Sequence, residues 1–201
     1  MELVLYYQPG TRALRVRCVL EELALPYRLE RIDLRKGEGN TRAYRAIHPL
    51  GQLPALQVDG EVMIESGAIV HWLAETHPEQ GLAPPPGTPA RRAFDQWMYF
   101  AVSTLEDPAW EIILHRDILP ERHAVKAIVP FAERRLRQVL DVLESALTGR
   151  QYLVEDRFGA ADIMVGYILM WFADECATRP ALHGYVERLA QRPAYLRARN
   201  D

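Results

Sequence analysis

A glutamate and a serine stand where a strand-like run gives way to a helical pattern. The run "EVMI" ends at Ile64, and Glu65 and Ser66 precede apolar residues that recur at helical spacing. Serine is a good N-cap, so a purely structural role accounts for it. A helix N-terminus with an exposed hydroxyl also attracts an anion such as a carboxylate, and Glu65 would hold an ammonium group beside it. The α-carbon end of an amino acid carries both groups.

A Leu-Pro pair opens the strand-like run that comes before. The runs "LPALQV" and "EVMI" are separated by "DG", which is a strong signal for a hairpin. Pro54 is tolerated at the first residue of a strand, where its missing N–H costs little. The alternative is a cis Leu53–Pro54 bond, which would turn the backbone N–H and C=O of Leu53 outward to pair with an extended peptide. The sequence alone leaves both interpretations open.

A small α/β unit is needed to position these residues. Residues 2–7 form a β-prone run closed by "QPGT", a helical pattern follows up to Pro26, and "YRLERIDL" alternates with period two. This order predicts a β-α-β unit with a parallel strand pair and a right-handed crossover. With a short helix near residues 41–47, the hairpin and the helix from Ser66, we predict the order β-α-β-α-β-β-α for residues 1–77.

The rest of the chain is predicted to be helical. Residues 78–89 form a linker, because several closely spaced prolines remove donors and fix φ. The segment "VPFAERRLRQVLDVLESAL" is amphipathic, whereas "GAADIMVGYILMWFADECA" is apolar nearly all round and belongs in the centre of a domain. We therefore expect an all-helical domain over residues 90–201.

Composition narrows the classes of partner. The 201 residues carry a formal charge of −3, so no basic field favours nucleic acid. Cys18 and Cys176 lie far apart in apolar helical patterns, and we expect reduced core thiols and a cytoplasmic protein. The N-terminus is broken too early, by Pro9 and Gly10, for a signal peptide, and no apolar run approaches membrane-spanning length. We expect no membrane partner.

Several kinds of site are not supported by the sequence. The histidines show no metal-ligand spacing such as HExxH, so we expect no metal. A glycine-rich phosphate loop and a GxSxG motif are also missing, which argues against nucleotide binding and serine hydrolase chemistry.

The order of segments resembles the cytosolic glutathione S-transferase family, including its bacterial members. The resemblance rests on "YYQPGTRALRVRCVLEELALPY", "NTRAYRAIHPLGQLPALQVDG", "ESGAIVHWLAE", the proline-rich linker and "RFGAADIMVGYIL", and it covers essentially the whole chain. It implies a thioredoxin-like N-terminal domain, an α-helical C-terminal domain and a homodimer. It also implies glutathione as a co-substrate, with no other cofactor.

The resemblance assigns roles to individual residues. Leu53 would pair its backbone with the cysteinyl part of glutathione, beside a cis Pro54. Glu65 and Ser66 would take the γ-glutamyl end, and Gln52 would reach the same region or the glycyl carboxylate.

A capping motif in the second half is altered. Asp162 matches the family's N-capping aspartate, but Gly159 stands where the family usually has Ser or Thr. Glycine supplies no side-chain acceptor, so the cap should be weaker by a few tenths of a kcal/mol.

Candidates for activating the glutathione thiol lie at the end of the first strand and the start of the first helix. A hydroxyl donor and the positive helix end both favour the thiolate. Thr11 is the preferred donor, although plain N-capping also explains it, and Tyr7 is either a donor or a packed strand residue. Arg12 occupies the cysteine position of the bacterial beta-like class, which disfavours covalent chemistry by a protein thiol. Arg12 is itself a catalytic candidate, since it could add a positive charge, or it could simply reach solvent. Tyr6 is a further candidate.

The second substrate is expected against the first helix of the C-terminal half. Pocket candidates fall on one side of that helix at three- and four-residue spacing, although core packing is the commoner role for such residues: Tyr99, Phe100, Ser103, Glu106 and Trp110. Together these features predict a detoxification enzyme that adds glutathione to a hydrophobic electrophile, or uses it to reduce a disulfide or a peroxide. The rival is a non-catalytic binding or assembly module of the same fold.

Overall fold

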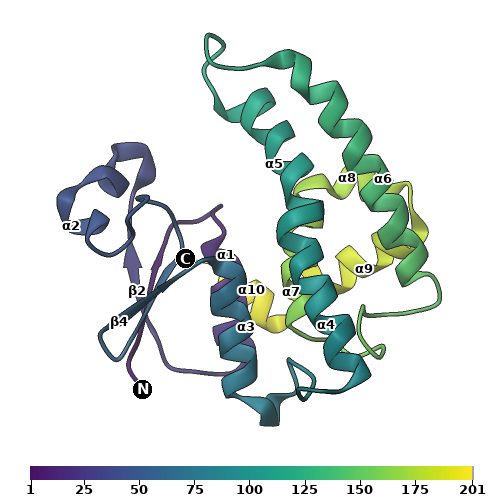
Figure 1. The fold of residues 1–201 in the computed structure, drawn as a ribbon, viewed down its shortest axis with the longest axis horizontal. Helices are drawn as coiled ribbons and strands as arrows, with labels where there is room; N and C mark the ends of the chain where they lie inside the picture. Colours follow the sequence, from purple (N-terminus) through teal and green to yellow (C-terminus); the bar gives the residue numbers. More distant parts are fainter. Residues whose placement is uncertain (201) are drawn as a thin grey trace. The chain divides into compact units, whose positions relative to one another are not determined.

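The computed structural model describes residues 1–200, and its internal contacts divide the chain into two units (Figure 1). Residues 1–83 and 191–200 form the first unit, and Pro84–Ala190 form the second. The last helix, α10 (Pro193–Arg199), therefore packs with the first unit, against α1 (Ala13–Glu22). The expectation that all of residues 90–201 form one helical domain is corrected for this segment.

Charged side chains join α10 to α1. The guanidinium of Arg192 contacts both carboxylate oxygens of Glu22, at 2.6 and 2.9 Å. Arg197 contacts the Glu21 carboxylate at 2.7 Å, and Arg17 on α1 donates to the carbonyl of Asn200 at 2.9 Å. These partners are between 170 and 183 positions apart in the chain, which is why a pattern of local periodicity does not reveal them.

The first unit is built on a four-stranded sheet of order β2-β1-β3-β4. Its strands are β1 (Leu3–Tyr7), β2 (Arg28–Arg31), β3 (Ala55–Val58) and β4 (Glu61–Ile64). Strand β1 pairs in parallel with β2 and antiparallel with β3, and β3 pairs antiparallel with β4. The predicted β-α-β unit and the hairpin at Asp59–Gly60 are both confirmed, and both turn residues have positive φ as the hairpin requires.

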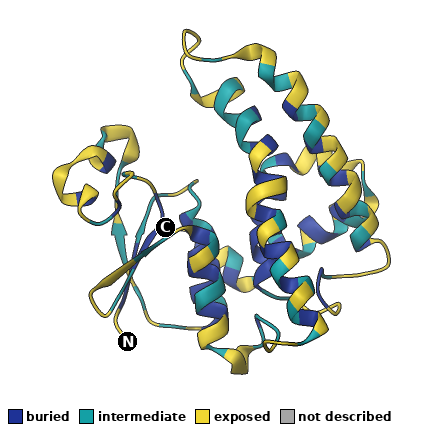
Figure 2. Ribbon diagram, viewed as in Figure 1, coloured by how far each residue is buried: buried dark blue, intermediate teal, exposed yellow. Residues whose placement is uncertain are grey.

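Helices α1 and α3 (Ser66–Thr76) pack on each other beside the sheet (Figure 1). Their buried faces meet a core in which Leu5, Val16, Leu56 and Ile69 are fully buried (Figure 2). The segment between β2 and β3 contains η1 (Leu34–Lys36), η2 (Glu38–Asn40) and α2 (Arg42–Arg45), and η3 (Pro78–Gln80) follows α3. This arrangement positions the start of β3 and the start of α3.

The second unit is helical throughout, apart from one isolated bridge, in the residues that the structure describes. Its elements are α4 (Pro89–Tyr99), η4 (Phe100–Leu105), α5 (Glu106–Ile113), η5 (Leu114–Ile118), η6 (Lys126–Ile128), α6 (Val129–Leu147), α7 (Ala160–Leu169), η7 (Met170–Phe172), α8 (Ala173–Ala177) and α9 (Pro180–Ala190). All ten residues of α7 are buried, which confirms the prediction of a central apolar helix.

The first long helix of this unit is not α-helical throughout. The segment η4, between α4 and α5, is a π-helix. Pro108 follows within α5, and it has no N–H to donate to the carbonyl of Thr104. A missing donor at this point is a physical cause for a break in the α-helical bonding, and it shifts the helical register.

Acidic side chains cap two helices of the second unit, one from within its own helix and one from a neighbouring helix. Asp162 accepts from the N–H groups of Gly159 and Leu153 at 2.9 and 3.0 Å, and the hydroxyl of Tyr185 donates to it at 2.8 Å. Glu144 on α6 accepts from the N–H groups of Ala181 and Leu182, at the start of α9.

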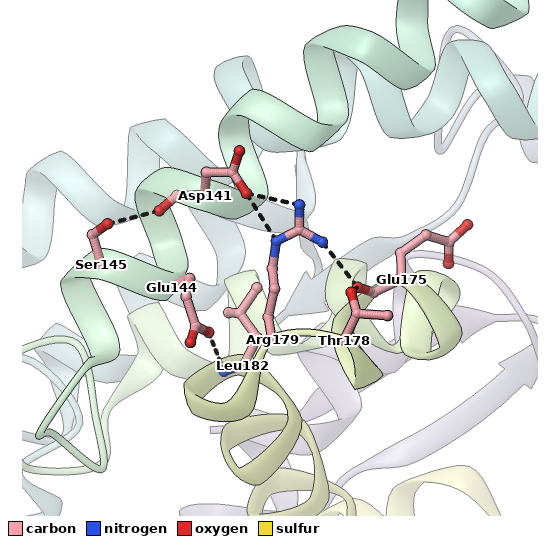
Figure 3. Close-up of polar contacts among 7 residues, drawn as sticks. All are labelled: Asp141, Glu144, Ser145, Glu175, Thr178, Arg179 and Leu182. Carbon is pink, nitrogen blue, oxygen red and sulfur yellow. Dashed lines mark hydrogen bonds and ion pairs between the residues drawn. The ribbon is translucent and has the colours of Figure 1, made fainter.

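An arginine completes the junction of α6 and α9. The guanidinium of Arg179 donates to Asp141 at 2.7 and 3.0 Å and to the carbonyl of Glu175 at 3.0 Å (Figure 3). The start of α9 is thus fixed by polar groups that come from α6 and α8. None of the helices within residues 1–200 is both long enough and apolar enough to cross a membrane.

Candidate functional site

The N-terminus of α3 holds a buried arginine next to the serine singled out in the sequence. Ser66 is 6% exposed, and its Oγ accepts a hydrogen bond of 3.2 Å from Nη1 of Arg15. Arg15 lies on α1 and is fully buried. A positive charge and the positive end of a helix therefore meet at one hydroxyl, which is an arrangement that stabilises an anion.

Sequence reasoning missed Arg15. The motif "LRVR" places Arg15 and Arg17 two positions apart, so they point to different sides of α1. Arg15 reaches Ser66 on α3, whereas Arg17 reaches the hydroxyl of Tyr27 at 3.2 Å and the C-terminal segment. The sequence does place Arg15 among apolar residues of a short helix. Arginines at the edge of an apolar stripe are usually exposed, so this signal did not indicate a buried side chain.

Glu65 precedes this serine in an unusual backbone conformation. Its φ is +70°, a region that side chains other than glycine rarely adopt. The residue is exposed, so its carboxylate is available to solvent and to ligands. Backbone conformations of this kind concentrate at binding sites, where the surrounding structure holds them.

The Leu53–Pro54 bond is cis, which resolves the alternative that the sequence left open. Pro54 is buried and Leu53 is 6% exposed. The pairing of Ala55 with Ile64 places Pro54 and Glu65 next to each other at one end of the β3–β4 hairpin. Leu53 and the Glu65–Ser66 pair, which the resemblance assigns to one ligand, are therefore neighbours in the fold.

The loop that leads to Leu53 is held by contacts with α2 and with the segment around Gly39. The hydroxyl of Tyr44 on α2 donates to the carbonyl of Gln52 at 2.7 Å, while the Gln52 side chain is exposed. Gly39 and Gly51 pack backbone to backbone, since a Cβ on Gly39 would lie 2.4 Å from the Gly51 oxygen. Gly51 also has a φ of +66°. Both glycines are thus required by the close approach of the two segments.

Thr11 closes the turn before α1. Its hydroxyl donates to the carbonyl of Gln8 at 2.7 Å and accepts from the N–H of Ala13 at 3.4 Å. The side chain is half-buried, as is that of Arg12, the N-cap residue of α1. The Thr11 hydroxyl has one hydrogen to donate. It could therefore donate a hydrogen bond to a thiolate at this helix end only if it gave up its bond to the carbonyl of Gln8.

Tyr7, the last residue of β1, lies next to Arg17 of α1. The guanidinium of Arg17 is 5.5 Å from the centre of its ring. Tyr7 lines a cavity of about 70 Å³ together with residues of the β1–α1 turn, α1 and α10: Gln8, Pro9, Gly10, Leu14, Arg17, Ala198 and Arg199. Tyr6 points elsewhere, with its hydroxyl 3.3 Å from Gln57 and its ring 5.9 Å from that of Tyr44. Of these three hydroxyl candidates, Thr11 is the one at the start of α1, where the donor was predicted.

The candidates for the second-substrate pocket have different environments. Tyr99 is 68% exposed. Ser103 is also exposed, and its hydroxyl donates to the backbone carbonyl of Tyr99 at 2.7 Å. Glu106 is only 6% exposed, and Trp110 is half-buried. The π-helical segment η4 lies among these positions, so the α-helical spacing from which a single face was inferred does not hold across it.

The cysteines do not supply a nucleophile. Cys18 and Cys176 are free and buried, as the sequence indicated, and burial raises the pKa of each thiol to about 12. Within residues 1–200 no group of three or more His, Cys, Asp or Glu side chains is arranged to hold a metal ion.

Comparison with known proteins assigns the family. The model for the N-terminal domain of glutathione S-transferases matches residues 11–76, and the model for the C-terminal domain matches residues 121–190. The crystal structure of a glutathione transferase from Methylococcus capsulatus is 30% identical, has a TM-score of 0.86, and the match covers 98% of this chain and 97% of that one. The chain belongs to the glutathione S-transferase family.

Other proteins are similar over nearly the whole length of the chain. Glutathione S-transferase 3 of Zea mays is 28% identical, with 96% of this chain and 91% of the relative covered. Maleylacetoacetate isomerase of Pseudomonas aeruginosa is also 28% identical, with 98% and 95% covered. The structure of transferase URE2P6 from Phanerochaete chrysosporium, in complex with oxidized glutathione, is 26% identical with a TM-score of 0.88, and the match covers 98% and 94%.

These findings confirm the predicted family, its two-part fold and the expectation of a glutathione S-transferase enzyme. In a member of this family, the Arg15–Ser66 pair, Glu65 and the cis Leu53–Pro54 bond are gathered where the start of α3 meets the start of β3. The sequence identified every one of these residues except the arginine.

Proposed function

We propose that this protein binds glutathione on its first unit, stabilises the thiolate and adds it to a hydrophobic electrophile. The observation that carries the proposal is the buried Arg15 beneath Ser66 at the start of α3. A buried guanidinium beside a helix N-terminus favours an anionic ligand, and the γ-glutamyl carboxylate of glutathione is such a ligand. Exposed Glu65 would hold the adjacent ammonium group.

The rest of the tripeptide would follow the edge of the sheet. The backbone of Leu53 would pair with the cysteinyl part, since its cis bond to Pro54 stands next to Glu65. Gln52 is exposed and would reach the glycyl carboxylate or the γ-glutamyl end. Extended backbone pairing gives affinity without demanding a particular side chain from the ligand.

Activation of the sulfur is assigned to the start of α1. A free thiol has a pKa near 8.5 and is mostly protonated at neutral pH, so an enzyme gains by favouring the anion. The hydroxyl of Thr11 and the positive end of α1 would do so, with Arg12 adding charge and Tyr7 as the remaining hydroxyl candidate. The test is Thr11→Val against Thr11→Ser: loss of the thiolate absorbance band in the first and its retention in the second would support the assignment.

The thiolate would then attack an electrophilic carbon. A carbon–sulfur bond forms, and either a leaving group departs with the bonding electrons or a conjugated double bond accepts them and takes up a proton. Tyr99, Ser103, Glu106 and Trp110 are the proposed contributors to the second-substrate pocket. Reduction of a disulfide or a peroxide by bound glutathione would use the same thiolate.

A second candidate reaction is favoured by the similarity to maleylacetoacetate isomerase. Addition of the thiolate to a cis double bond conjugated to a carbonyl would leave a single bond free to rotate. Elimination of the thiolate would then give the trans product and return glutathione unchanged. Consumption of glutathione during turnover separates the two: conjugation consumes one tripeptide per product, and isomerisation consumes none.

Binding is tested by Ser66→Ala, measured by calorimetric titration with glutathione. Loss of a charge-assisted hydrogen bond is worth about 1.5–3 kcal/mol, so the dissociation constant should rise by about 10- to 150-fold. The matched control is Ser145→Ala, because Ser145 donates to a backbone carbonyl on the exposed side of α6. Its affinity should equal that of the wild type.

The rival proposal is a non-catalytic binding or assembly module. It gains support if the wild-type protein, folded by circular dichroism, shows neither a heat of binding nor a thiolate band with glutathione. An electrophile that reacts in the presence of the wild type and fails to react with Ser66→Ala excludes it.

We also propose a cytoplasmic homodimer with a role in detoxification. The support for a dimer is the exposure of Tyr99 and Val102, which are 68% and 40% exposed on neighbouring turns. Sedimentation at low protein concentration tests it, and a species of 23.0 kDa alone would refute it.

A further inference from the structure

We propose that His48 is a positioning residue of the glutathione site, and that its neutral ring holds the loop of residues 48–53 in the shape that presents the Leu53 backbone. Glutathione affinity is then sensitive to pH through this one ring. The inference rests on the proposed glutathione binding and deepens it.

The contacts of His48 are those of a loop anchor. The side chain is 3% exposed, and its Nδ1 accepts a hydrogen bond of 3.3 Å from the N–H of Leu50. Its carbonyl accepts from the N–H of Gly51 at 2.8 Å. One residue thus closes the loop on itself, four positions before Gln52 and five before Leu53, the residues with predicted roles in binding.

The ring is also fixed from α2. The rings of His48 and Tyr44 are stacked at 6.5 Å, and the Tyr44 hydroxyl donates to the carbonyl of Gln52. His48 and Tyr44 thus hold the loop together: the His48 ring binds the N–H of Leu50, and the Tyr44 hydroxyl binds the carbonyl of Gln52. Displacing the imidazole would loosen the backbone from Leu50 to Gln52.

Protonation removes the anchor for a simple reason. Nδ1 can accept from Leu50 only while it carries no proton, so the bound form is the neutral ring with its proton on Nε2. In the charged ring two N–H groups would face each other across 3.3 Å. The loop must then shift, and the charge would also draw the carboxylate of Glu65 away from its proposed ammonium partner.

The charged and titratable groups of the elements packed around the ring come from α2, β1 and the start of α3. Tyr44 and Arg45 come from α2, Tyr6 comes from β1, and Glu65 stands at the start of α3. Arg45 donates to the carbonyl of Pro49, which brings a positive charge to the same loop. Burial lowers the pKa of His48 below its ordinary value of about 6.5, and the carboxylate of Glu65 acts in the opposite direction.

The sign of the effect follows from linkage. A ligand that binds only the neutral ring loses affinity as pH falls through the His48 pKa, by up to about tenfold for each pH unit below it. Glutathione itself keeps one charge state between about pH 5 and 7, because its carboxyl groups titrate lower and its amino and thiol groups titrate higher. In the complex, however, the proposed stabilisation of the thiolate brings the thiol pKa down toward the same window. S-methylglutathione has no ionisable thiol, so the pH dependence of its binding in that window belongs to the protein.

The experiment is a calorimetric titration with S-methylglutathione, whose sulfur carries no proton, from about pH 5 to 7 on the wild type and on His48→Asn. Asparagine keeps an acceptor at the same place and does not titrate. The dissociation constant of this variant should therefore change by less than about twofold between pH 5 and pH 7. The wild type should lose at least about fivefold in affinity at the acid end. His48→Ala, which lacks the acceptor, should bind weakly at both ends.

The chain supplies a matched control. Nδ1 of His115 accepts from the N–H of Val125 at 3.1 Å, which is the same contact in a loop of the second unit. His115→Asn should keep the pH dependence of the wild type. If His48→Asn shows the wild-type slope, the inference is overturned while glutathione binding stands. If the wild type binds no glutathione at about pH 7, the proposed function fails first.

A measurement on the wild type covers the case in which His48→Asn does not fold. The Leu50 amide should shift in ¹⁵N–¹H spectra with the same midpoint as the affinity, because its acceptor becomes protonated. A Leu50 amide that does not move between about pH 5 and 7 overturns the inference.

Discussion

The carboxylate of Asp162 is expected to contribute more to stability than any exposed acidic residue of the chain. It is fully buried, and it accepts from the backbone N–H groups of Gly159 and Leu153 and from the hydroxyl of Tyr185. The perturbation that isolates this role is Asp162→Asn, since it conserves shape and leaves no cavity.

The cost can be worked out from the contacts. Leu153 and Tyr185 bond to Oδ1, and Gly159 bonds to Oδ2. An amide that keeps its oxygen toward the first two turns its NH₂ group toward the Gly159 N–H, so one charge-assisted bond worth about 1.5–3 kcal/mol is lost. The other two weaken from charged to neutral. We therefore expect about 3 kcal/mol of destabilisation, which is a large part of the 5–15 kcal/mol typical of a folded protein.

The matched control is Asp156→Asn, in the loop before α7. Its Oδ1 accepts from the N–H groups of Gln151 and Tyr152, but the side chain is exposed and water replaces what the substitution removes. The expected cost is below about 1 kcal/mol. Urea unfolding followed by far-ultraviolet circular dichroism gives both free energies. Equal losses in the two variants would refute the reasoning, because burial would then make no difference.

Two further substitutions test close contacts and capping. Gly39→Ala should weaken glutathione binding and destabilise the first unit by about 1–3 kcal/mol, since the new Cβ meets the Gly51 carbonyl. The control is Gly184→Ala in α9, where the new Cβ meets no atom within 4 Å. In urea unfolding this variant should be as stable as the wild type or slightly more stable. Gly159→Ser should stabilise by a few tenths of a kcal/mol, because its extended backbone suits an N-cap serine; a loss measured in the same assay would contradict the capping argument.

Much of the candidate site was available from the sequence because its residues sit at the ends of elements. Glu65 and Ser66 mark the start of α3, and "DG" fixes the hairpin that brings Pro54 beside Glu65. Element ends are signalled by residue types with strong local preferences, so they can be located without knowing what packs around them. Whether the Leu53–Pro54 bond is cis depends on surrounding contacts, and the sequence left it undecided.

The face of the helix that follows the linker was less predictable. Spacing placed Tyr99, Ser103, Glu106 and Trp110 on one side on the assumption of 3.6 residues per turn. The π-helical segment η4 changes the register among them, and they differ from largely exposed to almost fully buried. Pro108 was visible in the sequence, but its effect on the preceding turn depends on how the helix is held by its neighbours.

By itself, the sequence determined the order of strands and helices, the central apolar helix α7 and the start of α3 at Glu65 and Ser66, because periodicity and end signals act over a few residues. Only the tertiary structure decided which distant groups complete them. Arg15 reaches Ser66 across two helices, Glu144 caps α9 from α6, and Arg192 ties α10 to α1. Each pairing joins groups between 38 and 170 positions apart, and their distance in the fold is set by packing of the apolar faces.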